Sequence, residues 1–288
     1  MAAGVSVVIA ARDEARSIGA VVNGVREALS AVQGLDFEVI VVSDGSLDDT
    51  AAVARAAGAD VVENPLSRGY GAALKRGIRT AAHPFVAIID GDGTYPAETL
   101  PRIVGELQRG ADQVVGARTT PRARIPLVRR PAKWLVRTLA SWFAGQRVPD
   151  LNSGLRGLRR STLEGVVRFL PDGFSCTTTL TMAGLLSDWS VVWLPVDYHR
   201  RTGTSKFRAV RDTCRLVLSL LRAVVYFRPL RLFLPIAMGV GALGAGFAAY
   251  DVFVVENLTD KTVLTCLTGL QIFVLGLLAD LISKRNAA

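Results

Sequence analysis

The sequence predicts an α/β catalytic domain built on a mostly parallel, Rossmann-like sheet, followed by a helical hairpin that spans a membrane. Through residues 1–117, short β-branched segments alternate with amphipathic segments in units of about 25 residues. Near the C-terminus, two nearly uninterrupted apolar segments each reach the roughly 20 residues that a helix needs to cross a bilayer. A chain of 288 residues is long enough for one such domain and this appendage.

The first part of the chain contains short apolar segments that predict buried strands. Their apolar runs are continuous rather than alternating, which is typical of parallel strands covered by helices on both faces. The expected strands are Val5–Ala10, Phe37–Val42, Asp60–Val62, Phe85–Ile89 and a segment centred on Val114–Val115. The expected helices between them are Ile18–Val32, Ser46–Ala57, Gly69–Ala82 and Ala97–Arg109. Further along, Trp189–Trp193 is expected to be strand core rather than a sugar-stacking surface.

The positive charge of the chain is concentrated in its middle third. Residues 1–117 carry a net charge of −5, residues 118–231 carry +15, and residues 232–288 carry −1. A basic block can indicate nucleic acid or an anionic membrane surface as its partner. Because this block directly precedes the most apolar part of the chain, we favour the membrane and expect no nucleic-acid partner.

Two segments of the basic block combine arginines with apolar and aromatic residues at helical spacing. They are residues 122–143 and Ser205–Phe227. Two interpretations stay open for each: a helix lying at the membrane interface, or a basic-faced helix packed on the core. We expect a catalytic domain over residues 1–204, a basic juxtamembrane helix over 205–229 and a hairpin over 230–288.

The two spans of the predicted hairpin are Leu232–Val255 and Val263–Ile282, joined by the short linker Glu256–Lys261. The alternative is a helical hairpin buried in a soluble protein. Basic residues flank the hairpin on both sides, at Arg222, Arg228, Arg231, Lys284 and Arg285. Because basic flanks stay in the cytosol, the pattern predicts a multi-pass protein of the cell membrane with a cytosolic catalytic domain.

Cysteine, histidine and the N-terminus exclude several classes of protein. Three scattered cysteines and two histidines make a disulfide framework, a zinc site and a Ser-His-Asp triad poor interpretations. The apolar run Val5–Ala11 is short, lacks a preceding basic residue and is followed at once by charged residues. It is therefore not expected to be a signal peptide.

Acidic side chains follow two of the predicted strands. Asp44 comes after the second strand, and Asp90-Gly91-Asp92 comes after the fourth. In a parallel sheet these strand ends share one edge, where ligands bind. Two carboxylates on alternate residues can share one hard cation and leave room for phosphate oxygens in its shell. Asp and Gly also form ordinary turns, so the second acidic loop at the same edge is what strengthens the metal interpretation.

Six ordered segments resemble one family. They are Val7–Glu14, Ser43–Thr50, Ser67–Ala73, Asp90–Asp92, Asp150–Arg156 and Arg200–Lys206. They are similar to the motifs V-I-P-x-Y-N-E, D-D-G-S-x-D-x-T, N-x-G-x-G-A-A, D-x-D, D-x-x-S-G-F-R and R-x-x-G-x-S-K. These belong to inverting nucleotide-sugar glycosyltransferases of GT-A fold, in the branch of dolichol- or polyprenyl-phosphate sugar synthases. The two-span tail is similar to one sub-branch. Three positions depart from the motifs: Ala10 replaces proline, Asp13 replaces asparagine, and Ser43 replaces the first aspartate of its loop.

The resemblance implies roles for individual residues. The residues expected at the nucleotide-sugar donor are Ala10, Arg12, Glu14, Asp44, Arg68, Asp90 and Gly91. Asp90 and Asp92 would hold Mg²⁺ or Mn²⁺, and Asp92, Arg118 and Arg129 are the expected catalytic residues. Ser153, Arg200 and Lys206 would bind the phosphate of the acceptor, although Ser153 could equally be a simple turn residue.

The chemistry of such a transfer fits this composition. The acceptor phosphate is already ionised, so no general base is needed, and a divalent ion with arginine donors stabilises the leaving diphosphate. One direct displacement inverts the anomeric carbon. The resemblance favours UDP-hexose as the donor, with GDP-mannose next, and polyprenyl phosphate as the lipid acceptor. It leaves a homo-oligomer open.

Three other functions fit the sequence less well. A nucleotidyltransferase that makes nucleotide sugars would carry a Gly-rich N-terminal signature and no membrane hairpin. A processive polysaccharide synthase would need a longer chain, more spans and a Q-x-x-R-W segment, which this sequence lacks. A non-enzymatic membrane adaptor would not need acidic side chains at strand ends.

Overall fold

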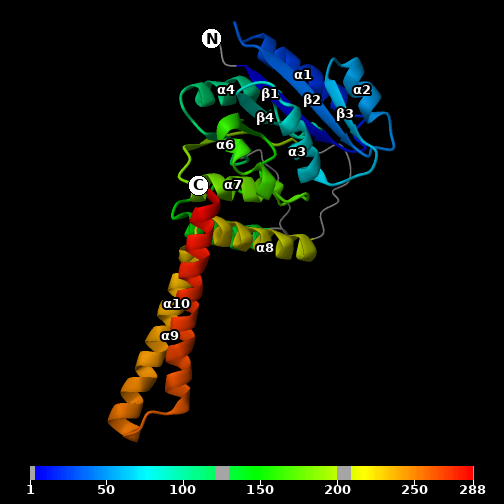
Figure 1. The fold of residues 1–288 in the computed structure, drawn as a ribbon. Coiled ribbons are helices and arrows are strands. Elements are labelled where there is room, and N and C mark those ends of the chain that lie inside the picture. Colours follow the sequence, from blue (N-terminus) through cyan, green and yellow to red (C-terminus); the bar gives the residue numbers. More distant parts are fainter. Residues whose placement is uncertain (1–3, 121–129, 200–208, 288) are drawn as a thin grey trace. The chain divides into compact units, whose positions relative to one another are not determined.

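The computed structural model describes residues 4–120, 130–199 and 209–287. The chain divides into two compact units, Met1–Ser219 and Leu220–Ala288. The first unit is an α/β domain around a single sheet, and the second is helical (Figure 1).

The sheet of the first unit has seven strands in the order β3-β2-β1-β4-β6-β5-β7. They are β1 (Val5–Ala11), β2 (Phe37–Asp44), β3 (Asp60–Asn64), β4 (Phe85–Ile88), β5 (Gln113–Ala117), β6 (Arg156–Arg159) and β7 (Val191–Pro195). The pairs β1–β2, β1–β4, β2–β3 and β5–β7 are parallel, and β6 runs antiparallel between β4 and β5. The predicted α/β class and mostly parallel sheet are confirmed.

The antiparallel strand β6 was not expected from the sequence. Its four residues, Arg-Gly-Leu-Arg, contain no apolar run, yet Arg156 is completely buried. The strand pairs with β4 in the register Ile88 to Arg156 and Phe85 to Arg159. Because β6 runs opposite to β4, the residues just before β6 lie beside those just after β4. This register brings Asp150–Leu155 to the edge where Asp90 and Asp92 lie.

Helices cover both faces of the sheet. They are α1 (Ile18–Ser30), α2 (Thr50–Ala56), α3 (Tyr70–Thr80), η1 (Ala97–Thr99), α4 (Leu100–Gln108), α5 (Arg130–Ala144), α6 (Arg160–Glu164), η3 (Val167–Phe169) and α7 (Cys176–Leu186). Alternate residues of β1, such as Val7 and Ile9, share one buried cluster with α1 and α4. On the opposite face α3 comes so close that a side chain at Gly77 would collide with Val8.

The helix expected over Ser46–Ala57 begins later than predicted. The structure starts α2 at Thr50 and keeps residues 46–49 as a loop. The Asp48 carboxylate accepts hydrogen bonds from the backbone N–H groups of Thr50 and Ala15, each at 3.1 Å. This side chain therefore ends the loop and ties it to the loop after β1, as aspartate often does before a helix.

The two basic segments form helices where the structure describes them. α5 carries the exposed side chains of Trp134 and Trp142, and α8 (Ala209–Phe227) carries the exposed Leu218. Exposed large aromatic side chains beside arginines fit a helix at a membrane interface. The interfacial position of both helices stays a prediction.

The second unit is dominated by two long helices that run side by side (Figure 1). They are α9 (Leu230–Tyr250), extended by the π-helical turn η4 (Asp251–Val255), and α10 (Asp260–Ala287). The segments Leu230–Val254 and Asp260–Arg285 are long and apolar enough to span a membrane, and only 11% and 17% of their most apolar windows are buried. A hairpin in the core of a soluble protein would be mostly buried, so the exposure favours the predicted membrane hairpin.

The tip of the hairpin is closed by one buried carboxylate. Asp251 Oδ2 accepts hydrogen bonds from the backbone N–H of Thr259 at 2.8 Å and from the hydroxyls of Thr259 and Thr262 at 2.5 and 2.7 Å. The Lys261 ammonium lies 3.7 Å from Asp251 Oδ1. Every partner lies within 11 residues of Asp251, so the turn is closed locally.

Candidate active site

The parallel strands β3, β2, β1 and β4 end at one edge of the sheet. The loops that follow them contain Arg12 and Glu14 after β1, Asp44 at the end of β2, Arg68 after β3, and Asp90 after β4. The structure therefore brings the predicted donor-binding residues to a common edge, where α/β proteins bind ligands. Their roles there are taken up as proposals below.

Asp44 is held by four hydrogen bonds from two neighbouring segments. The residue is 4% exposed, and its carboxylate accepts bonds from the Asn64 amide, the Ser67 hydroxyl and the backbone N–H groups of Arg68 and Gly69, at 2.8 to 2.9 Å. Burial raises the pKa of Asp44, but the four donors outweigh it and leave this pKa below its ordinary value. Asp44 is therefore a fixed negative charge that holds the loop after β3.

Polar contacts join the loop after β1 to the loop after β3 and to the start of α2. Arg12 donates from its guanidinium to Ser67 Oγ at 2.9 Å, and the Glu14 N–H donates to Thr50 Oγ1 at 2.8 Å. Ala10 is buried within β1, whereas the side chains of Arg12 and Arg68 are exposed at the edge. Two exposed arginines, Arg12 and Arg68, thus lie at the edge of the sheet that also contains the buried carboxylate of Asp44.

The Asp90-Gly91-Asp92 triplet directly follows the buried end of β4. Tyr70 donates its hydroxyl to Asp90 Oδ1 at 2.7 Å. Asp92 is almost completely buried, and its Oδ1 accepts bonds from the N–H and hydroxyl of Thr94 at 3.1 and 2.6 Å. A Cβ atom at Gly91 would lie too close to the Glu14 carboxylate, so a larger residue there would require the Glu14 side chain to move.

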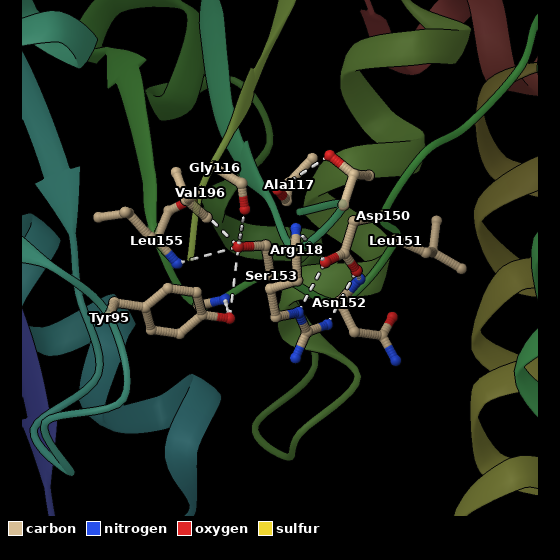
Figure 2. A network of polar contacts seen from close by, with 12 residues as sticks. Tyr95, Gly116, Ala117, Arg118, Asp150, Leu151, Asn152, Ser153, Leu155 and Val196 are labelled. Atoms are coloured by element: carbon tan, nitrogen blue, oxygen red, sulfur yellow. Dashed lines mark hydrogen bonds and ion pairs between the residues drawn. The ribbon is translucent and has the colours of Figure 1, made fainter. Parts of the chain in front are cut away.

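A second polar network lies beside the triplet, where β5 ends and β6 begins. Figure 2 shows the bidentate contact of Arg118 with Asp150, in which Nε donates to Oδ2 at 2.6 Å and Nη2 donates to Oδ1 at 2.8 Å. The backbone N–H of Arg118 adds a third bond to Asp150 at 3.1 Å. Both side chains are mostly buried, with 17% and 1% exposed. A planar bidentate contact of this kind fixes the orientation of the guanidinium.

The charge of Arg118 is secured by this pairing. Burial lowers the pKa of the guanidinium, but the Asp150 carboxylate together with Tyr95 and Tyr198 outweighs it, so the pKa lies well above its ordinary value. The guanidinium also lies 5.2 Å from the centre of the Tyr198 ring. Arg118 therefore stays positively charged beside the acidic triplet. Its two hydrogen bonds to Asp150 hold the guanidinium in one position.

Ser153 lies in the interior of this network rather than at its surface. The side chain is completely buried, and its hydroxyl donates to the carbonyl oxygen of Gly116 (Figure 2). Ser153 Oγ also lies 3.4 Å from the Tyr95 hydroxyl oxygen. That hydroxyl oxygen in turn accepts a hydrogen bond from the Gly154 N–H at 2.8 Å. In this conformation Ser153 joins β5 to the segment before β6; its predicted phosphate contact stays a prediction.

Three participants in these networks were not assigned a role from the sequence. Tyr70 and Arg156 lie within the matched segments Ser67–Ala73 and Asp150–Arg156, whereas Tyr95 lies in no matched segment. Arg156 is fully buried and donates to the carbonyl oxygen of Thr177 at 3.1 Å and to that of Ser153. Its place as the arginine of the D-x-x-S-G-F-R motif is the signal that could have singled it out. Three predicted residues, Arg129, Arg200 and Lys206, lie outside the described residues.

The donor set of the triplet suits a hard divalent cation. Asp90 and Asp92 offer carboxylate oxygens, the ligands that Mg²⁺ and Mn²⁺ prefer. Among the residues that the structure describes, no group of three or more His, Cys, Asp and Glu side chains is placed to hold a metal. The triplet alone is therefore an incomplete shell, and it fits an ion whose remaining ligands come from a phosphate-bearing substrate and water.

Two protein-family models and several known proteins match the chain. The model of glycosyl transferase family 2 matches residues 6–166, and that of the GtrB C-terminal hairpin matches residues 228–284. A dolichyl-phosphate hexose transferase of Haloferax volcanii is 32% identical over 168 residues, which are 58% of this chain and 72% of that protein. A dodecaprenyl-phosphate galacturonate synthase of Rhizobium johnstonii is 28% identical over 97% of this chain and 87% of its own length.

A solved structure shares the fold of the first unit. It is glucosyl-3-phosphoglycerate synthase from Mycobacterium tuberculosis in complex with Mn²⁺, UDP and glucosyl-3-phosphoglycerate. The two chains are 25% identical, with a TM-score of 0.61 over 77% of this chain and 80% of that one.

These matches agree with the architecture and confirm the resemblance seen in the motifs. The family 2 match extends from β1 to α6 and so contains both acidic strand ends and the Arg118–Asp150 network. The hairpin match covers α9 and nearly all of α10. The chain is thus a glycosyltransferase of GT-A fold with a C-terminal membrane-type hairpin, and it belongs to glycosyl transferase family 2.

Proposed function

We propose that this enzyme transfers a hexosyl group from a nucleotide sugar to polyprenyl phosphate, with inversion at the anomeric carbon. The observation that carries the proposal is the combination, in one chain, of the Asp90-Gly91-Asp92 triplet at a GT-A strand end with an exposed apolar hairpin. The names of the two relatives, a dolichyl-phosphate hexose transferase and a dodecaprenyl-phosphate galacturonate synthase, support a polyprenyl-phosphate acceptor. UDP-hexose is the preferred donor and GDP-mannose the next.

The donor is proposed to lie across the edge formed by β1, β2 and β4. Asp90 and Asp92 hold Mg²⁺ or Mn²⁺, and the UDP and Mn²⁺ of the M. tuberculosis synthase support this assignment. The bound ion supplies positive charge to the diphosphate leaving group. The other proposed donor residues line the nucleoside and diphosphate positions: Ala10, Arg12, Glu14, Asp44, Arg68 and Gly91. Asp44 contributes by holding the loop that carries Arg68.

The acceptor needs little acid–base chemistry. A lipid phosphate is an anion at neutral pH, so it attacks without a general base, and its alignment with the anomeric carbon carries much of the rate. Arg118, fixed on Asp150, is proposed to offset the repulsion between the two phosphate groups, together with Arg129. Ser153, Arg200 and Lys206 are proposed for the acceptor phosphate, Ser153 through the backbone it holds.

The proposed orientation puts both ends of the hairpin and the catalytic domain, residues 1–204, in the cytosol, where nucleotide sugars are supplied. Basic residues outside both spans support it, including Arg228 and Lys284. In a variant without native cysteines, an impermeant thiol reagent added outside cells should label Asn257→Cys but not Asn286→Cys. The reverse pattern of labelling would refute the orientation.

The decisive experiment offers the purified full-length enzyme a panel of radiolabelled nucleotide sugars and polyprenyl phosphate in detergent with Mn²⁺. We expect one nucleotide sugar to give a lipid-soluble product that carries a single sugar, with UDP-hexose the first candidate. The Asp92→Asn variant is the matched control and should give none. Transfer only to growing polysaccharide, or no transfer to lipid with any donor, would refute the proposal.

A further inference from the structure

The Asp90 carboxylate lies between Tyr70, which donates a hydrogen bond to it, and Gly154, which lies close to it. On one side the Tyr70 hydroxyl donates to Asp90 Oδ1 at 2.7 Å. On the other side lies Gly154, which the register of Ile88 opposite Arg156 places across from Asp90, two residues beyond the paired strands. A Cβ atom at Gly154 would collide with the Asp90 carboxylate. The orientation of this carboxylate is therefore set by its surroundings.

The Tyr70 side chain is itself fixed in position. Its ring stacks on Phe174, with ring centres 5.9 Å apart and an angle of 14° between the planes. Tyr70 is the first residue of α3, and the next two N–H groups, of Gly71 and Ala72, donate to the Asp172 carbonyl at 2.8 and 3.1 Å. Lys75 pairs with the Asp172 carboxylate and donates to the Leu170 carbonyl at 2.9 Å. The loop of residues 170–174 thus anchors the start of α3.

The segment that contains Gly154 is also fixed by hydrogen bonds. The Gly154 N–H donates to the Tyr95 hydroxyl at 2.8 Å, and the neighbouring Ser153 is bonded to Gly116. Arg156 adds a bond from its fully buried guanidinium to the Ser153 carbonyl. The backbone around Gly154 is therefore held in place by its own hydrogen bonds.

The direction of the bond between Tyr70 and Asp90 is fixed by the chemistry of the two groups. An ionised carboxylate only accepts hydrogen bonds, so the Tyr70 hydroxyl is the donor, at 2.7 Å from Asp90 Oδ1. The bond therefore restrains the rotation of the Asp90 carboxylate.

We propose that Tyr70 is a positioning residue that orients the Asp90 carboxylate for the divalent ion, with Gly154 providing the space that this orientation needs. Ligating carboxylates are commonly held by hydrogen bonds from outside the metal shell, and loss of such a partner costs about 10- to 100-fold in metal affinity or activity. The inference rests on the proposed metal role of Asp90. Through the stacking of Tyr70 on Phe174, the proposed metal site is linked to the loop of residues 170–174.

The test compares the detergent-solubilised full chain with its Tyr70→Phe variant, which keeps the stacked ring and removes only the hydroxyl. Calorimetry measures UDP binding over a series of Mn²⁺ concentrations, and sugar transfer is measured over the same series. We expect the Mn²⁺ concentration for half-maximal UDP binding to rise about 10-fold, with transfer returning to within about twofold of wild type at saturating Mn²⁺. Tyr250→Phe, the same change in the helical hairpin, should leave the Mn²⁺ dependence unaltered.

A second variant tests the role of Gly154. Gly154→Ala should raise the Mn²⁺ requirement by more than Tyr70→Phe, because its methyl group displaces the carboxylate rather than merely releasing it. An unchanged Mn²⁺ requirement in Tyr70→Phe would overturn the proposal, and so would an equal loss of UDP binding without metal. If the wild-type enzyme does not glycosylate polyprenyl phosphate, the proposed function fails, but the Mn²⁺-dependent UDP binding still decides the role of Tyr70.

Discussion

The two units bury their carboxylates in different ways. At the sheet edge, Asp44 accepts its bonds from residues 20 to 25 positions away, and Asp150 meets Arg118 across 32 positions. At the hairpin tip, Asp251 accepts its hydrogen bonds from Thr259 and Thr262, 8 and 11 positions away. The sheet edge is thus assembled by the tertiary fold, whereas the tip is assembled by a single turn.

This difference indicates what each set of carboxylates does. A carboxylate whose donors come from several loops holds those loops in a fixed relation, which a binding site requires. Asp251, whose donors all lie in one turn and which has no proposed ligand, stabilises that turn alone. Changes at Asp44 and Asp150 should therefore alter ligand binding and transfer, and a change at Asp251 should alter only the stability of the hairpin.

The largest effect is expected at Asp92. Asp92→Asn keeps an oxygen for the bonds from Thr94 but loses the charge that the divalent ion needs. We expect transfer to fall by at least about 1,000-fold, on the order of 4 kcal/mol of transition-state stabilisation, with the melting temperature nearly unchanged. Transfer assays and thermal unfolding measure the two quantities. EDTA should abolish wild-type transfer reversibly, and full activity in excess chelator would contradict the metal assignment.

The next effect is expected at the buried ion pair. Asp150→Ala leaves the Arg118 guanidinium without its carboxylate at a site where only 17% of the side chain is exposed. Removing one partner of a buried pair costs about 3–5 kcal/mol in the free energy of unfolding, and transfer should fall as Arg118 loses its position. Denaturant unfolding of the first unit measures the cost.

An exposed ion pair in the same unit provides the control for that measurement. Glu164 pairs with Arg160 at 2.9 Å one helical turn away, with 62% and 33% of the side chains exposed. Glu164→Ala should cost no more than about 0.5 kcal/mol, because solvent screens such pairs. Equal costs for Asp150→Ala and Glu164→Ala would show that the buried network does not hold the sheet edge together.

A smaller effect is expected at Asp44. Asp44→Asn offers one acceptor oxygen to donors that now bond two, so unfolding should cost about 1–3 kcal/mol less at pH 7 and UDP binding should weaken. Because the folded pKa of Asp44 lies below its ordinary value of 3.8, its charge contributes stability above that pH and loses it as the pH falls through the folded pKa.

Denaturant unfolding at pH 7, 5 and 3 measures this dependence. The difference between wild type and Asp44→Asn should be full at pH 7 and 5 and should shrink at pH 3. A difference that grows on acidification would mean that Asp44 is protonated in the folded state, contrary to its four donors.

The contrast between the units also explains what the sequence could predict. The acidic strand ends were placed correctly because β2 and β4 are continuous apolar runs, so their last residues are visible in the sequence. The two spans were visible because length and apolarity alone define them. In each case the signal lies within a few consecutive residues.

The remaining features depend on contacts between distant segments. Nothing local indicates that Arg156 is buried, or that β6 lies between β4 and β5, because its residues carry charges and a glycine. The contact of Tyr70 with Asp90 depends on how α3 is rotated over the sheet. The late start of α2 depends on an N–H from the neighbouring loop that bonds Asp48. Pairing and register decide these positions, and a single sequence does not reveal them.

The smallest effect is expected at the hairpin tip, and it tests the comparison directly. Asp251→Asn retains one acceptor oxygen for its threonine donors and loses the attraction to Lys261. We expect the turn to lose about 1–2 kcal/mol of local stability, measured as faster hydrogen exchange at residues 256–262. Asp260→Asn, an exposed aspartate at the start of α10, is the control and should change local stability by at most about 0.5 kcal/mol. Mn²⁺-dependent UDP binding should stay within about twofold of wild type, because no donor of Asp251 comes from the sheet edge. If Asp251→Asn weakens UDP binding as much as Asp44→Asn does, the tip is coupled to the sheet edge and the division between the two units is wrong.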